Sequence, residues 1–116
     1  MFEVWADPAF DRELRALPRP TAQAIEAALP GLRAAPLEHP QVVRLHGARH
    51  AASIRLRVGR ARVIALVLQT QRVILLTTCF VKKRQSDYDQ ALLRHERRLR
   101  AQGPPLSGFI EKAKRR

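Results

Sequence analysis

Basic residues recur in the second half of the chain at a spacing that places them on one face of a β-strand. Arg55 and Arg57 alternate with apolar residues, and Arg62 begins the next apolar run, just after Gly59-Arg60. A third apolar run ends in the basic segment Lys82, Lys83, Arg84. If neighbouring strands pair, these cations converge toward one end of a sheet. Such a patch can hold a phosphodiester and stabilise the extra negative charge of its transition state.

Tyr88 and the histidines are the further candidates for chemistry. Tyr88 can stack on a base or hydrogen-bond near a phosphate, or pack against the sheet, and both interpretations stay open. His46 and His50 are candidate general bases, although their place in a loop favours an incidental role for each. His95 falls within an apolar helical stripe, which predicts partial burial, and Cys79 falls within an apolar strand, which predicts a buried thiol.

The sequence offers no pattern for a metal or a nucleotide cofactor. No histidine pair with a nearby carboxylate suggests a zinc site, and the basic half has too few acidic residues for a two-metal nuclease. No glycine-rich phosphate loop is present. We therefore expect neither metal nor cofactor.

The charge is both extreme and uneven. The 116 residues carry a formal net charge of +12. Residues 1–40 contain four Arg and six Asp or Glu, whereas residues 41–116 contain eighteen Lys or Arg and four Asp or Glu. A one-sided positive field attracts a polyanion: RNA, DNA or an anionic membrane.

A membrane is the weakest of these partners. The longest apolar region, Val63 to Val81, is interrupted by Gln69–Arg72, and no run approaches the roughly 20 apolar residues of a spanning helix. The first residues do not form a signal peptide. The single cysteine excludes an intramolecular disulfide and suits a reducing compartment, so we expect a cytoplasmic protein.

Hydrophobic spacing predicts a single α+β domain. Residues 2–6 form a strand, residues 8–17 a helix, and a second helix starts with Thr21 as its cap and stops or kinks at Pro30-Gly31. Residues 54–58, 62–68 and 72–80 form an antiparallel sheet of three or four strands, and Ser86 caps a final helix. The domain spans 1–102, and we expect it to fold without the basic C-terminal tail 103–116.

Three segments resemble toxins of the RelE/ParE superfamily. Residues 54–64 (IRLRVGRARVI) resemble the strand–turn–strand pattern "RIRVGDYRVIY" of RelE-type toxins. Residues 76–83 (LTTCFVKK) resemble the "LLHGFxKK" ending of HigB-like, phage-related members, and Leu45-His46-Gly47 resembles their "kLxG" segment. A basic helix with Ala91 and Arg98 follows, as in that group, so the resemblance covers about residues 40–100.

The resemblance implies a ribosome-dependent mRNA endonuclease, the toxin of a type II toxin–antitoxin system. In such toxins the 2′-hydroxyl attacks the adjacent phosphate without a metal, and a cognate antitoxin covers the basic face or displaces the last helix. The match assigns catalysis to Arg62, Lys82, Lys83 and Tyr88. It assigns RNA binding to the remaining cations, Arg55, Arg57, Arg60 and Arg84.

The sequence also departs from the family pattern. Ala61 and Ala65 replace two aromatic residues, and Thr78 and Cys79 replace the "HG" pair. A missing aromatic would remove a base-stacking platform. The alternatives are a ParE-like gyrase inhibitor or degenerate toxin on the same fold, or a plain RNA- or DNA-binding module, whose affinity would fall steeply with salt.

Overall fold

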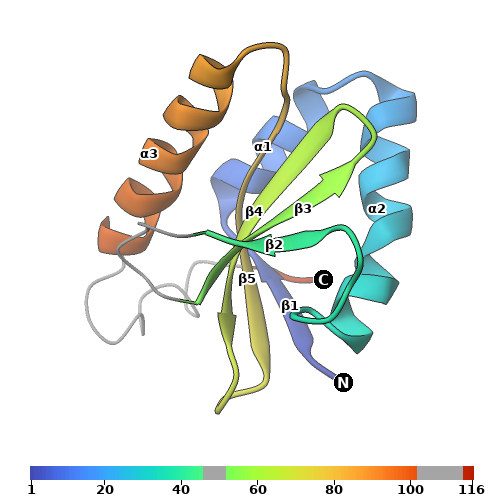
Figure 1. The fold of residues 1–116 in the computed structure, drawn as a ribbon, viewed down its shortest axis with the longest axis vertical. Helices are drawn as coiled ribbons and strands as arrows, with labels where there is room; N and C mark the ends of the chain where they lie inside the picture. The colour runs from blue at the N-terminus through green and yellow to red at the C-terminus, as the bar shows by residue number, and fades with distance from the viewer. Residues whose placement is uncertain (46–51, 102–113) are drawn as a thin grey trace.

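One β-sheet separates a pair of helices on one face from a single helix on the other (Figure 1). The computed structural model describes residues 1–45, 52–101 and 114–116. The elements follow in the order β1 (Glu3–Ala6), α1 (Pro8–Ala16), α2 (Arg19–Ala34), β2 (Val42–Arg44), β3 (Ser53–Val58), β4 (Ala61–Leu68), β5 (Val73–Val81), α3 (Gln85–Ala101) and β6 (Lys114–Arg115). This order confirms the α+β class and the predicted succession of strand, two helices, strands and helix.

The sheet is mixed, with strand order β2-β3-β4-β5-β1-β6. Strands β2 to β5 pair antiparallel, as predicted, but the sheet has six strands rather than the three or four that were predicted, because β1 and β6 join it. β1 pairs parallel with β5, from Glu3 opposite Val73 to Ala6 opposite Leu76, and β6 pairs antiparallel with β1. A parallel pair needs a long connection, supplied here by α1, α2 and the first three antiparallel strands. Local spacing alone did not predict this pairing.

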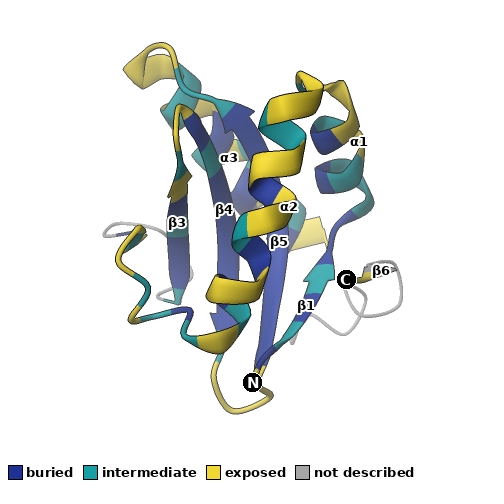
Figure 2. Ribbon diagram, turned by 90° about the vertical axis from the view of Figure 1, so that its right-hand side faces the viewer, coloured by how far each residue is buried: buried dark blue, intermediate teal, exposed yellow. Residues whose placement is uncertain are grey.

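Alternation along β4 divides its side chains between two cores. Val63, Ala65 and Val67 join the larger core on the side of α1 and α2, whereas Ile64 and Leu66 pack on the side of α3. Nearly all of β4 is buried, as expected for a central strand covered on both faces. Figure 2 shows α2 with its buried side toward the sheet and its exposed side outward.

The predicted cap of the second helix is wrong, and so is the prediction that the helix stops at Pro30-Gly31, whereas the alternative of a kink there stays a prediction. α2 begins at Arg19, so Thr21 lies inside it and is not its cap. Pro20 fits in the first turn, because its missing N–H would have no partner there. The helix also continues past Pro30, since the next turn buries Leu32 completely against the core.

The second half of β5 has an open edge that side chains close. β1 ends beside Leu76, so the residues after it have no strand on that side. The Cys79 N–H donates to Glu13 Oε1 (3.4 Å), and Arg98 Nη1 donates to the Thr77 carbonyl (2.6 Å). Arg98 also binds the Glu13 carboxylate through two nitrogens, at 2.8 and 3.1 Å. Glu13 on α1 and Arg98 on α3 thus join the two helix layers across this edge.

We expect the Glu13→Gln substitution to destabilise the fold by about 1–3 kcal/mol, because it leaves Arg98 half-buried beside a neutral group. The free energy of unfolding in urea measures the effect. Glu38→Gln, an exposed position with no side-chain partner among the described residues, is the control. Equal midpoints for the two variants would contradict the role given to Glu13.

The last three residues return to the domain. The Arg116 N–H donates to the Val4 carbonyl (2.7 Å), extending the pairing of β6 with β1. The Arg116 guanidinium binds Asp11 of α1 at 2.8 Å and both carboxylate oxygens of Glu26 of α2, at 2.7 and 2.8 Å. It also lies 5.6 Å from the centre of the Phe10 ring. Residues 114–116 therefore contact the domain, so the division at 102 stays a prediction and most of the tail lies outside the described residues.

We predict that Arg116→Ala lowers the free energy of unfolding by about 1–2 kcal/mol, because it removes a partly buried charge network. Thermal and urea unfolding measure the loss. Arg100→Ala, an exposed arginine on α3, should leave stability unchanged. Indistinguishable unfolding of the two variants would show that the C-terminal contacts contribute nothing.

Candidate functional site

Three arginines stand side by side on the α3 face of the sheet. Arg57 of β3 lies directly opposite Arg62 of β4, and Arg55 lies two residues further along the same face of β3. Within the described part of the chain, none of the three has a carboxylate at ion-pair distance. Like charges placed opposite each other destabilise a sheet. This arrangement therefore favours binding of an anion. We call these three residues the arginine cluster.

The Arg62 guanidinium is held by the turn that precedes it. Its Nη1 donates to the carbonyls of Gly59 and Ala61, both at 2.9 Å. Gly59 has a φ of +58°, which glycine adopts without strain and which the tight β3–β4 turn requires. Partial burial lowers the pKa of Arg62, and the neighbouring charges of Arg55 and Arg57 lower it further. The Nε atoms of Arg55 and Arg62 are buried and have no hydrogen-bond partner among the described residues.

Tyr88 borders the arginine cluster from the first turns of α3. The Arg55 guanidinium lies 5.9 Å from the centre of its ring, and the Phe80 ring lies 6.5 Å away at an angle of 40°. Burial raises the pKa of the Tyr88 hydroxyl, Asp89 raises it further, and Arg55 opposes them. Tyr88 is therefore a neutral phenol near pH 7, which is able to donate a hydrogen bond. Its contact with Phe80 confirms that it packs against the sheet. Its role toward a base or a phosphate stays a prediction for a ring that lies beside the cluster.

The remaining predicted cations surround the cluster more loosely. The Lys82 N–H donates to the Arg60 carbonyl (2.9 Å), so both residues lie at the hairpin end of the sheet. Lys83 and Arg84 are exposed in the link to α3, and no described contact joins their side chains to the arginine cluster. Arg60 lines a groove on the α2 side of the turn. The structure thus gathers Arg55, Arg57, Arg62 and Tyr88 but not all eight predicted residues.

The start of α3 depends on Asp87 rather than on the predicted cap Ser86. The helix begins at Gln85, so Ser86 lies within its first turn. The Asp87 carboxylate accepts hydrogen bonds from the Lys83 and Arg84 N–H groups, at 2.9 and 3.0 Å. These bonds hold the pKa of Asp87 below its ordinary value, because they favour the charged form. Asp87 thereby orders the basic segment that leads from β5 into α3.

We expect Asp87→Asn to lower the melting temperature at pH 7. A carboxyl with a lowered pKa stabilises the fold above its unfolded-state pKa of about 3.9, and that contribution is lost as the pH falls through the folded value. The difference between wild type and variant should therefore shrink below about pH 4. Thermal melts from pH 7 to pH 2.5 follow this change. Asp89→Asn is the control, and a difference independent of pH would contradict the assignment.

His95 connects α3 to the sheet and is more deeply buried than its sequence pattern predicted. It is completely buried. Its Nε2 lies 2.8 Å from Ser53 Oγ of β3, and its Nδ1 lies 2.5 Å from Thr77 Oγ1 of β5. Thr77 Oγ1 donates to the Ile64 carbonyl, so it accepts from Nδ1–H, and Nε2 accepts from Ser53. These bonds join α3 to β3 and to β5. Only the placement of His95 within an apolar stripe signalled this in the sequence.

The other singled-out residues have structural surroundings or lie outside the described part. Cys79 is buried as predicted, and burial together with the Glu13 charge raises the pKa of its thiol to about 12. His39 Nδ1 accepts a hydrogen bond from the Gln41 N–H (3.0 Å). The candidate bases His46 and His50 lie outside the described residues.

The two alanines that replace family aromatics face away from the arginine cluster. Ala61 and Ala65 are both about 1% exposed and belong to the core on the α1 and α2 side. Arg62 and Ile64, which lie between these two alanines in the sequence, point to the α3 side of the sheet. The expectation that these alanines remove a base-stacking platform is therefore wrong, because no ligand on the α3 face can reach them.

Metal binding and membrane insertion find no support in what the structure describes. Among residues 1–45, 52–101 and 114–116, no three His, Cys, Asp or Glu residues cluster closely enough to hold a metal ion. None of the described helices is long and apolar enough to cross a membrane.

The fold is similar to that of solved RelE toxins. A scan against models of known protein families finds no match for the sequence, and a search of curated proteins finds none. The archaeal RelE–RelB complex from Pyrococcus horikoshii OT3 matches with a TM-score of 0.62 and 22% identity, covering 72% of this chain and 97% of that chain.

Two further structures match in the same way. The isolated Escherichia coli RelE toxin has a TM-score of 0.59 and 19% identity, covering 82% of this chain and 99% of that chain. The RelB–RelE complex from Methanococcus jannaschii has a TM-score of 0.56 and 17% identity, covering 73% of this chain and 95% of that chain. The chain thus has the RelE fold over nearly the whole length of these toxins.

Proposed function

We propose that the chain is the toxin of a type II toxin–antitoxin system, of the HigB-like type, and that it cleaves mRNA in the ribosomal decoding site. The RelE fold supports the class of protein. The observation that carries the proposal is the arginine cluster, in which three cations without described counter-ions lie beside a neutral tyrosine. A site of this kind fits a phosphodiester and its flanking base.

The proposed reaction needs no metal. The 2′-oxygen attacks the adjacent phosphorus and the bond from phosphorus to the 5′-oxygen breaks, which leaves a 2′,3′-cyclic phosphate and a 5′-hydroxyl. The phosphate gains negative charge in the transition state, and preorganised donors stabilise that charge most where water is excluded. Arg62 suits this role, since two carbonyls of the turn fix its guanidinium through Nη1 and no carboxylate of the described residues neutralises its charge.

Two proton transfers accompany the proposed reaction. The attacking 2′-hydroxyl must lose a proton and the leaving 5′-oxygen must gain one. Tyr88 is a neutral phenol, so it suits donation better than acceptance. The general base stays open between His46, His50 and no base at all, because in-line positioning of the phosphate can supply much of the rate. Lys82 at the hairpin end, with Lys83, Arg84 and Arg60, is proposed to contact the RNA backbone on either side.

The proposed protein partner is a cognate antitoxin. Two of the similar structures are complexes of RelE with RelB. An arginine cluster without counter-ions also favours a partner that supplies acidic side chains.

We predict that expression of the wild-type chain in a bacterial host arrests growth and produces new 5′ ends within translated frames. Arg62→Ala should reduce cutting about 100- to 1,000-fold, as loss of a donor to a developing oxyanion does. Lys82→Ala should also reduce it. Arg62→Ala should keep the wild-type melting temperature, because the substitution relieves repulsion from Arg55 and Arg57.

Arg97→Ala, an exposed position on α3, is the matched control and should cut mRNA as the wild type does. Undiminished cutting by both Arg62→Ala and Lys82→Ala would overturn the site. Arrest without cuts but with a DNA-damage response would instead indicate a gyrase inhibitor. Salt-sensitive RNA binding with neither arrest nor cuts would indicate a binding module.

A further inference from the structure

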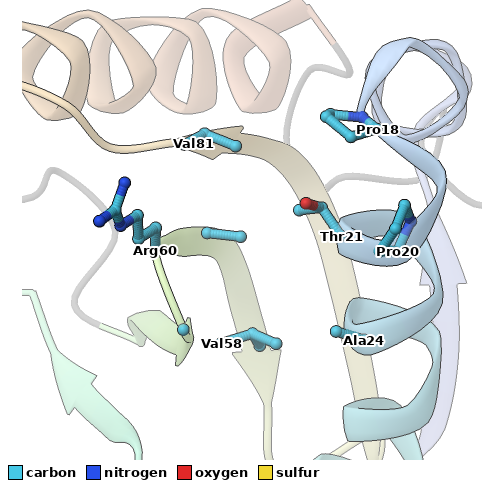
Figure 3. Close-up of a pocket in the computed structure, with 9 residues that line it drawn as sticks. Pro18, Pro20, Thr21, Ala24, Val58, Arg60 and Val81 are labelled. Atoms are coloured by element: carbon cyan, nitrogen blue, oxygen red, sulfur yellow. The ribbon is translucent and has the colours of Figure 1, made fainter.

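An apolar groove lies at the hairpin end of the sheet, on the face opposite the arginine cluster. Its floor is a row of residues across three strands, in which Ala61 pairs with Val58 on one side and with Val81 on the other. Its wall is the first part of α2, and Figure 3 shows Pro18, Pro20, Thr21 and Ala24 facing this row. The groove has a volume of about 420 Å³.

The groove lies between the first part of α2 and the ends of three strands. Val58, at the end of β3, and Val81, at the end of β5, are only partly buried. Ala61 between them is small, which deepens the floor. Exposed apolar surface that is continuous and concave is characteristic of a docking site, because covering it with another apolar surface releases water.

The polar groups around the groove specify the charge of its occupant. Among the described residues that line the groove, Thr21 and Arg60 are the only ones with polar side chains. Arg60 has no carboxylate at ion-pair distance in the described part of the chain. α2 starts at this wall without a side-chain cap and without an acidic residue in its first turn. Both features favour carboxylates on the occupant, as does the net charge of +12.

We propose that this groove binds an acidic amphipathic helix of the antitoxin. The assignment rests on the proposed function, which supplies the antitoxin as partner. Apolar side chains one turn apart on such a helix fill the floor between Val58 and Val81, and its carboxylates meet Arg60 and the start of α2. RNA does not fit, because its phosphates gain nothing from an apolar floor. A second copy of this chain would bring like charges together.

The position of Arg60 connects the groove to the arginine cluster. Arg60 lies in the two-residue turn that joins Arg62 to β3, and its carbonyl binds the Lys82 N–H. A helix seated in the groove therefore lies beside the hairpin that carries the cluster. The acidic chain that follows it can cross the turn and cover the cluster, so antitoxin and RNA compete for the same hairpin.

The test uses the full chain with a defined probe, the purified product of the reading frame adjacent to its gene. The dissociation constant of the complex is measured for two groove variants, Ala24→Arg and Arg60→Glu. Each should weaken binding at least about tenfold, as substitutions at the centre of an interface do. The matched controls are Gln23→Arg, on the exposed side of the same helix, and Arg97→Glu on α3, and both should bind as the wild type does.

A second measurement separates docking from catalysis. Ala24 is outside the arginine cluster, so Ala24→Arg should keep its thermal transition and its mRNA cutting, yet resist neutralisation when the probe is co-expressed. Equal binding of the groove variants and controls would overturn the groove while leaving the proposed function intact. Failure of the wild-type chain to bind the probe would overturn the groove together with the antitoxin as partner, whereas the 5′-end mapping tests the nuclease independently.

Discussion

The Glu13 carboxylate replaces a missing strand along half of β5. β1 ends beside Leu76, and an unpaired strand edge beyond that point would expose backbone groups to solvent or to another chain. Glu13 accepts from the Cys79 N–H, while Arg98 binds both that carboxylate and the Thr77 carbonyl. The ion pairs of Glu13 with Arg94 and Arg98 thereby close the edge and join the helices on the two faces of the sheet. The position of α3, and of Tyr88 within it, depends on these contacts.

The arginines of this unevenly charged chain fall into two groups, those that form ion pairs and those on the strands that do not. The acidic residues of the N-terminal part form ion pairs with arginines far along the chain, which neutralises part of the C-terminal surplus. These pairs join Glu3 to Arg115, Asp11 and Glu26 to Arg116, and Glu13 to Arg94 and Arg98. The arginines on the strands receive no such partner among the described residues. The few carboxylates thus join the layers of the fold, and the positive charge that they do not neutralise lies on strands that a polyanion can approach.

The sequence predicted the parts of the structure that depend on local spacing. Alternation placed Arg55, Arg57 and Arg62 on one sheet face, since side-chain direction in a strand follows directly from residue parity. The same parity explains why the alanines at 61 and 65 do not affect that face. The predicted cap and stop of α2 were wrong because proline is tolerated in a first turn and because burial of Leu32 outweighs the break at Pro30.

Long-range contacts could not be predicted in this way. The parallel pairing of β1 with β5 and the return of Arg116 to α1 and α2 join segments separated by most of the chain. The groove beside Arg60 depends on where α2 begins relative to the sheet, which no residue pattern encodes.

His95 determines how α3 can move. Its ring bonds to Ser53 on one side and to Thr77 on the other, at a depth without solvent contact. A slide or rotation of α3 by even one residue would break both of these bonds at a fully buried position, which is costly. Small displacements of the helix along the sheet are therefore disfavoured. We expect α3 to leave the sheet as a unit rather than to slide along it.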